Sequence, residues 1–226
     1  MPHESTAPAY GLWPLVVINS ALFIMFAFSF AKPQSKRDWR SMGAFSAFII
    51  ALFTEMYGFP LTIYLLAPWL QSRFPGTNLF THDMGHLWYS VLGWKGDPHL
   101  NPIHIASQVF IVAGFWIVAS AWSVLLRAQK EGRLATVGPY RFMRHPQYAG
   151  FILVMFGFLL QWPTLVTLIM FPVLLVMYTR LALTEEADVR AQFPNEYQLY
   201  ANDVPRFFPK VFGTIRREES GSQHLS

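Results

Sequence analysis

The sequence predicts an all-α integral membrane protein with about five transmembrane helices, including a C-terminal helical hairpin, and a helical cap on the cytoplasmic side. Of its 226 residues, 53% are hydrophobic and only 13% are charged, whereas a soluble domain carries about 25% charged residues. Long apolar runs account for this deficit. The chain contains no cysteine, which excludes disulfides, thiolate metal sites and cysteine nucleophiles.

Apolar stretches in the first half of the chain predict three membrane segments. The first, Leu12 to Ala31, is long enough to cross a hydrocarbon core of roughly 30 Å and too long for a signal-peptide core. The second, Met42 to Leu70, contains Glu55. We expect it to break at Gly58-Phe59-Pro60, because proline removes a helical hydrogen bond. The third span runs from Ile103 to Leu126.

The last two apolar stretches predict a hairpin. Ala149 to Trp162 would be a helix only about 21 Å long, too short to cross alone, and it leads directly into Pro163 to Leu183. Basic residues orient the five spans, since fifteen of the seventeen fall on one side and only Arg73 and Lys95 on the other. The positive-inside rule then predicts an outside N-terminus and a cytoplasmic C-terminus. We expect a multi-pass protein of the bacterial inner membrane.

Polar segments lie on both sides of the hairpin. Because the hairpin begins just after the first segment and ends just before the second, its two ends meet. The residues brought together in this way are Arg144, His145, Tyr148, Glu185 and Glu186. Such groups at the mouth of a membrane-embedded helix pair require a partner or a ligand. Individually they suit interfacial anchors or a solvated helix face, but their joint occurrence favours a chemical site.

A series of short motifs follows one order along the second half of the chain. The series is Gly138-Pro139-Tyr140-Arg141, Arg144 to Gly150 (RHPQYAG), Glu185-Glu186, Phe193, Glu196-Tyr197, Tyr200 and Val204-Pro205-Arg206-Phe207. It resembles the isoprenylcysteine carboxyl methyltransferase family, a group of integral-membrane methyltransferases related to the phospholipid methyltransferases. The resemblance covers residues 103–209, and the N-terminal half matches only in being hydrophobic.

The resemblance implies an enzyme that uses S-adenosyl-L-methionine and methylates a lipophilic or membrane-associated acceptor. The implied cofactor-binding residues are Leu134, Ala135, Tyr140, Arg144, His145, Pro146, Gln147, Tyr148 and Glu185. The implied catalytic residues are Arg180, Glu186 and Arg206, and no metal is implied. A direct count puts Leu181 where the family has its substrate-orienting arginine, which leaves Arg180 and Arg206 as two candidates for that role.

These residue types suit methyl transfer from a sulfonium. A carboxylate such as Glu185 binds amino or hydroxyl groups, and the faces of Tyr140 and Tyr148 attract the positive sulfur. An arginine clamps an acceptor carboxylate through two hydrogen bonds. An acceptor that is already anionic needs no base, so positioning would dominate the rate. The chain lacks the glycine-rich fingerprint of the soluble, doubly wound methyltransferases.

We expect three parts in the chain and a membrane-lipid partner. Residues 1–102 would hold the N-terminal membrane helices and an outer segment, 103–212 the methyltransferase core with the hairpin and the cytoplasmic cofactor site, and 213–226 a disordered tail. The formal net charge of +4 is explained by topology, so membrane lipid rather than nucleic acid is the expected partner. The oligomeric state is left open.

Two other functions compete with this one. Membrane reductases of the sterol-reductase type use NADPH and carry a similar RHP-x-Y-x-G element, although they usually have Asn where Gln147 stands. A small transporter or metal-handling protein is the second alternative. It is suggested by Glu55, a carboxylate in an apolar stretch, and by a group of outer residues: His82, His86, His99, His104, Asp83 and Asp97.

Each of these two polar features also has a structural interpretation. Glu55 lies close to the predicted helix break, where hydrogen bonding at the break accounts for it; we favour this role. The outer histidines fit an amphipathic interfacial helix with Trp88 and Tyr89 at the headgroups, which we favour over a metal site.

Overall fold

The computed structural model describes residues 10–73, 75–76, 78–80, 85–86, 88, 92 and 100–209. Over these residues the protein is an all-α integral membrane fold, which confirms the predicted fold class. The part of the chain that is described has four helices long and apolar enough to cross a membrane: α1 (Trp13–Phe30), α2 (Lys36–Phe53, continued by a turn to Gly58), α5 (Pro102–Lys130) and α7 (Leu165–Gln192). A shorter apolar helix, α6 (Pro146–Gln161), completes the predicted five.

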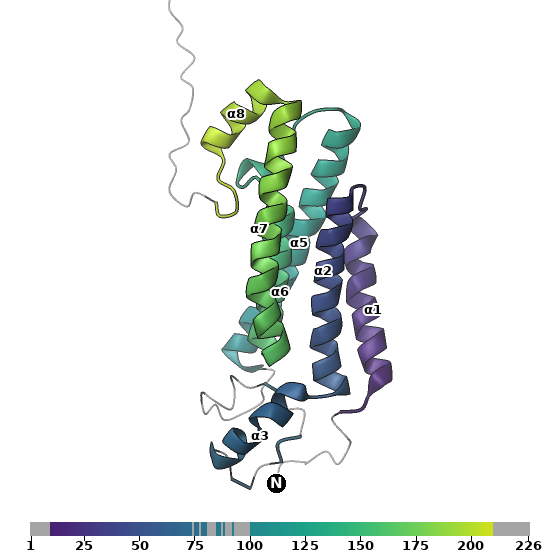
Figure 1. The fold of residues 1–226 in the computed structure, drawn as a ribbon, viewed down its shortest axis with the longest axis vertical. Coiled ribbons are helices and arrows are strands. Elements are labelled where there is room, and N and C mark those ends of the chain that lie inside the picture. Colours follow the sequence, from purple (N-terminus) through teal and green to yellow (C-terminus); the bar gives the residue numbers. More distant parts are fainter. Residues whose placement is uncertain are drawn as a thin grey trace, which may run out of the picture.

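The helices are arranged as two neighbouring groups (Figure 1). Helices α1 and α2 lie side by side, and α5, α6 and α7 lie together beside them. The helix α3 (Leu61–Arg73) lies beyond one end of this bundle, and α8 (Pro194–Asp203) lies over the other. The starts of α2 and α6 and the ends of α1, α5 and α7 therefore meet at the end that carries α8.

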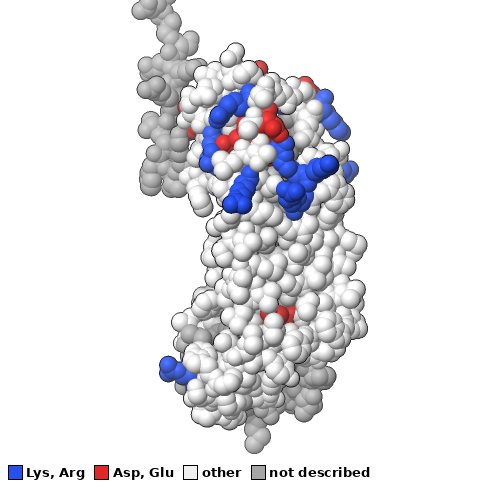
Figure 2. All heavy atoms as spheres, viewed as in Figure 1, with Lys and Arg blue, Asp and Glu red and all other residues white. Residues whose placement is uncertain are grey.

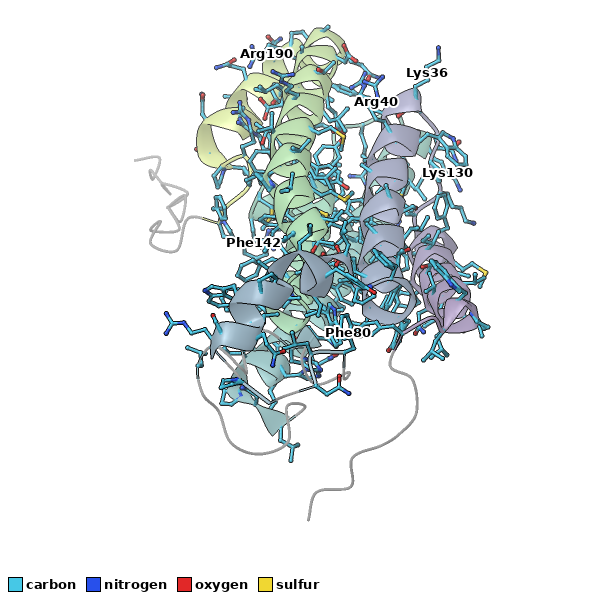
Figure 3. The ribbon with its side chains drawn as sticks, turned by 60° about the horizontal axis from the view of Figure 1, so that its bottom comes forward. Lys36, Arg40, Phe80, Lys130, Phe142 and Arg190 are labelled. Atoms are coloured by element: carbon cyan, nitrogen blue, oxygen red, sulfur yellow. The ribbon has the colours of Figure 1, made fainter. Side chains whose placement is uncertain are left out.

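Charge separates the two ends of the bundle. Figure 2 shows lysines and arginines gathered around an acidic patch near the α8 end, above a long uncharged band. Figure 3 shows Lys36, Arg40, Lys130 and Arg190 at this end, which we call the basic end. Arg73 ends α3 at the opposite end. This separation fits the five-span prediction, whereas the side of the membrane that each end faces stays a prediction. Lys95 and residues 210–226, including the predicted tail, lie outside the described residues.

The break between α2 and α3 falls at the predicted Gly58-Phe59-Pro60. The chain forms a π-helical turn over Thr54–Gly58, and α3 begins at Leu61. Glu55 lies in this turn and is buried, and its Oε2 accepts the backbone N–H of Thr62 at 2.8 Å. The carboxylate thus satisfies a backbone donor in the first turn of α3, where the helix dipole also favours a negative charge. This contact supports the structural role for Glu55.

Helices α5 and α6 pack very closely because small residues lie at their contact. A Cβ on Gly150 would stand 2.5 Å from Cγ2 of Val118, and one on Gly114 would stand 2.8 Å from the carbonyl oxygen of Gly150. Such close backbone approach is a common way to join membrane helices. It fixes the first turns of α6, which begins at Pro146, against the middle of α5.

The predicted hairpin joins α6 to α7 at Trp162-Pro163. Thr164 and Thr167 form a capping box that starts α7, and the hydroxyl of Tyr178 donates to the carbonyl oxygen of Ser41 on α2 at 3.0 Å. Helix α7 continues to Gln192, well past the predicted end at Leu183, because no proline or glycine lies between Leu183 and Pro194. The acidic pair is therefore part of the helix and not of a loop after it.

Candidate functional site

A cavity of about 420 Å³ lies at the basic end, between the start of α2, the end of α5, the start of α6 and the end of α7. This volume is in the range of small-molecule sites. Eight of the residues implied by the motifs line it: Leu134, Ala135, Tyr140, Arg144, His145, Tyr148, Glu185 and Glu186. The two ends of the hairpin meet here, as the topology predicted.

Four further residues implied by the motifs lie outside the lining of this cavity. Pro146 is the buried first residue of α6. Gln147 is buried behind the cavity wall, where its Oε1 accepts the hydroxyl of Tyr140 at 3.0 Å. Arg206 reaches the site through Glu186. Arg180 is exposed on α7. The cofactor-binding and catalytic roles of all twelve residues stay predictions.

Glu186 is the centre of the charged cluster, and only 6% of it is exposed. Its Oε1 lies 2.9 Å from Nε of Arg206, 3.1 Å from Nε2 of His145 and 3.2 Å from Nη2 of Arg144. Its Oε2 accepts from Nη2 of Arg206 at 2.9 Å, so this arginine binds both oxygens. Because both oxygens are occupied, Glu186 organises its neighbours and does not present a free base.

Glu185 has a different environment from its neighbour. It is half-buried and lines the cavity, with Oε2 3.5 Å from Nδ1 of His145 and 3.4 Å from Nε2 of Gln147. These contacts are longer than strong charge-assisted hydrogen bonds. The carboxylate of Glu185 is thus the acidic group best placed to bind a ligand.

His145 lies between the two carboxylates. Burial lowers its pKa, but hydrogen bonds with Glu185 and Glu186 and the charges of these carboxylates raise it more, and the net pKa is above the usual range. The imidazole is therefore biased toward its charged form and away from acting as a base. Its ring also stacks on that of Tyr148 at 5.7 Å between centroids, which fixes the aromatic face at the cavity.

The segment after α7 folds back as the predicted helical cap. The backbone N–H groups of Arg144 and His145 donate to the carbonyl oxygens of Pro205 and Arg206, at 2.9 and 3.1 Å. The hydroxyl of Tyr200 on α8 donates to the carbonyl oxygen of Tyr140 at 2.7 Å. The Val-Pro-Arg-Phe motif therefore closes the cap by pairing with the segment that starts α6.

Several residues of the cavity wall were not predicted from the sequence, and two of them form an ion pair. Arg37, from the first turn of α2, and Asp188, from the end of α7, line the cavity and form an ion pair with each other. Asp188 follows Glu185 by three residues, which places both on one helix face. That spacing was a usable signal for Asp188, whereas the position of Arg37 depends on how α2 packs against α7.

Of the four outer histidines, the structure describes His86 and His104, which lie close together away from the cavity. His82, Asp83, Tyr89, Asp97 and His99 lie outside the described residues. The rings of His86 and His104 have centroids 5.4 Å apart, and Nδ1 of His86 is 3.1 Å from the carbonyl oxygen of Gln161. Over the described ranges, no three metal-ligating side chains come together.

Comparison with known proteins bears on the central part of the chain. Residues 100–190 match the isoprenylcysteine carboxyl methyltransferase (ICMT) family. The family resemblance is confirmed for this segment. It contains α5, α6 and nearly all of α7, and thus most of the cavity wall. Members of the ICMT family use S-adenosylmethionine and act on lipid-modified substrates, so the match supports a membrane methyltransferase.

A curated relative matches about half of the chain. The chain is 32% identical over 111 residues to the cobalt-zinc-cadmium resistance protein CzcN of Cupriavidus metallidurans. The alignment takes in 48% of this chain, and the chain spans about half the length of the relative. No solved structure matches the chain. The domain boundaries predicted from the sequence stay predictions.

Proposed function

We propose that the protein is an S-adenosyl-L-methionine-dependent methyltransferase that acts on a lipophilic or membrane-associated acceptor. The observation that carries this proposal is the cavity at the basic end, because the family match supplies most of its wall and because a half-buried carboxylate, Glu185, lines it beside Tyr148. Its place at one end of an apolar bundle supports a reaction near a membrane surface.

The residues present fit such a cofactor. Nε of Arg144 and the hydroxyl of Tyr197 are buried at the cavity without hydrogen-bond partners among the described residues. Unsatisfied buried groups of this kind are costly, and a ligand rich in hydroxyl, carboxylate and ring-nitrogen atoms satisfies them. Glu185 complements the positive amino group of the same ligand, and the face of Tyr148 complements a sulfonium.

The chain's own residues position the reactants. Held beside Glu185 and Tyr148, the cofactor would supply an activated methyl group to an electron pair of the acceptor, with the electrons of the broken carbon–sulfur bond left on sulfur. Glu186 holds Arg144, His145 and Arg206 in place around the donor site. Since His145 is biased toward its charged form, no proton acceptor is assigned, and the acceptor reacts in a form that is already deprotonated.

Titration of the purified protein with S-adenosylhomocysteine tests the proposal. Saturable binding is expected, and Glu185→Gln should weaken it about tenfold, as for one charged hydrogen bond. Asp203→Asn is the matched control, because Asp203 is exposed at the end of α8 and is not part of the cavity lining. Absence of saturable binding would remove the proposal, and saturable binding of NADPH in its place would favour the reductase.

Methyl transfer itself is tested with a labelled donor. Incubation with membrane lipid extract should give a labelled product that partitions into organic solvent, and its identification would name the acceptor. A label that stays wholly in water-soluble products would contradict a lipophilic acceptor.

A further inference from the structure

Three arginines line the cavity, and they differ in the groups that each one binds. Arg144 contacts Glu186 and donates to the carbonyl oxygen of Ala201 at 3.2 Å, so it is part of the cap. Arg133 pairs with Glu131, two residues away in the same loop. Arg37 comes from the N-terminal half of the chain, outside the segment that matches the family. Its partner is Asp188, on the far side of the contact between α2 and α7.

The first turn of α2 holds Arg37 in a fixed place. Ser35 and Asp38 form a capping box, and Oδ2 of Asp38 accepts the backbone N–H groups of Gln34 and Ser35, each at 2.9 Å. One turn later, the bond from Tyr178 to Ser41 ties α2 to α7. Asp38 is thus committed to the helix start, although it lines the cavity, whereas the Arg37 guanidinium remains at the mouth.

The pair of Arg37 with Asp188 is exposed enough to be exchanged. The side chains are 32% and 60% exposed, and ion pairs this exposed to solvent contribute little to stability. A guanidinium carries five N–H donors in a planar fork that matches a carboxylate, and the pair uses Nη2. An entering anion can therefore bind Arg37 in place of Asp188 at little cost.

We propose that Arg37 binds the anionic head of the acceptor and that Asp188 holds the arginine in position until the acceptor arrives. The inference rests on the proposed function and deepens it by naming the residue that would select an acceptor with an anionic head. Asp188 shares a helix face with Glu185, so a head bound at Arg37 lies beside the carboxylate assigned to the donor. Arg37 is a specificity residue outside the matched segment.

Two variants that break the same ion pair distinguish this role from a structural one. The protein, in nanodiscs of zwitterionic lipid and saturated with S-adenosylhomocysteine, is titrated with palmitate and, separately, with hexadecyltrimethylammonium. Arg37→Gln should weaken palmitate binding about tenfold, the factor for a loss of 1.4 kcal/mol, and Arg37→Lys should weaken it less. Asp188→Asn should leave it unchanged or tighten it, because the competing carboxylate is gone.

Arg40→Gln is the control, since Arg40 is exposed one turn along α2 and is not part of the cavity lining. If Arg37→Gln and Asp188→Asn weaken palmitate binding alike, or if the cationic amphiphile binds better than palmitate, the proposal is overturned. Both variants should retain wild-type affinity for S-adenosylhomocysteine. If the wild-type protein does not bind S-adenosylhomocysteine, the proposed function itself is wrong, so the two failures are distinguishable.

Discussion

Two buried glutamates, one at each end of the bundle, are stabilised in different ways. Glu186 is 6% exposed and Glu55 is 5% exposed. Glu186 contacts two guanidinium groups and an imidazole. Glu55 accepts a single backbone N–H, from Thr62, and its Oε1 has no hydrogen-bond partner among the described residues. The degree of burial of a glutamate therefore does not distinguish the candidate functional site from the structural helix junction.

The groups that contact each carboxylate do distinguish the two sites. A buried charge is tolerated when charged groups and hydrogen bonds compensate it, and Glu186 obtains both from segments far apart in the sequence. Glu55 depends on the start of one helix, which supplies a backbone donor and a partial positive charge. The basic end is thus a cluster that closes only when the cap has folded, while the opposite end is a local helix junction.

The largest expected effect is that of Glu186→Gln. This change keeps the shape but leaves Arg144, Arg206 and His145 without their shared countercharge, and breaking a buried pair costs about 3–5 kcal/mol. We expect a large fall in the free energy of unfolding together with loss of S-adenosylhomocysteine binding. Glu185→Gln is the comparison, and it should reduce binding with little change in stability. A stable Glu186→Gln variant with wild-type binding would show that the cluster does not hold the cap.

A smaller effect is expected at Glu55. Glu55→Ala removes the acceptor of the Thr62 N–H and should cost about 1 kcal/mol, as for loss of a helix cap. Glu55→Gln keeps an oxygen in that place and should leave folding intact, as measured by thermal unfolding. If the Gln variant folds normally but has lost all methyl transfer, the structural interpretation of Glu55 is wrong and the opposite end takes part in function.

The pH dependence of stability is expected to come partly from His145. Its pKa is raised in the folded protein, so the folded state holds the proton more tightly than the unfolded state does. This stabilisation is fully present below the unfolded pKa, about 6.5, and is lost as pH rises through the raised folded value. The wild-type melting temperature should therefore fall over that range more steeply than that of His145→Gln. Equal slopes in the two proteins would contradict the raised pKa.

Much of the fold follows from local features of the sequence. The positions of the long helices were predicted from apolar runs. The break was predicted from Gly58-Phe59-Pro60 and the hairpin turn from Trp162-Pro163. The end of α7 was predicted too early because the apolar run stops at Leu183, while the propensity to form a helix continues through the acidic pair to Gln192. Hydropathy predicts where a segment leaves the lipid, and the helix can continue beyond that point.

The candidate site was predictable only where its residues are close in sequence or joined by the hairpin. The meeting of His145 with Glu185 and Glu186 followed from topology alone. The pairing of Arg37 with Asp188, and of Arg206 with Glu186, depends on how α2 packs on α7 and how the cap folds back. Neither distance is encoded in local spacing, so these arginines could not be given partners from the sequence.

The smallest effect is expected for Arg180, one of the two arginines that the motifs offered for orienting the acceptor. It is exposed on α7 and lies outside the cavity lining, and surface substitutions usually change free energies by about 0.5 kcal/mol or less. Arg180→Gln should thus alter kcat/KM for methyl transfer about twofold at most. Arg206→Gln removes one hydrogen bond from each oxygen of Glu186 and should weaken S-adenosylhomocysteine binding as well. A different result would contradict the role proposed for Arg37. If Arg180→Gln greatly raises KM for the acceptor but leaves S-adenosylhomocysteine binding unchanged, the acceptor binds at the exposed face of α7 and not at the start of α2.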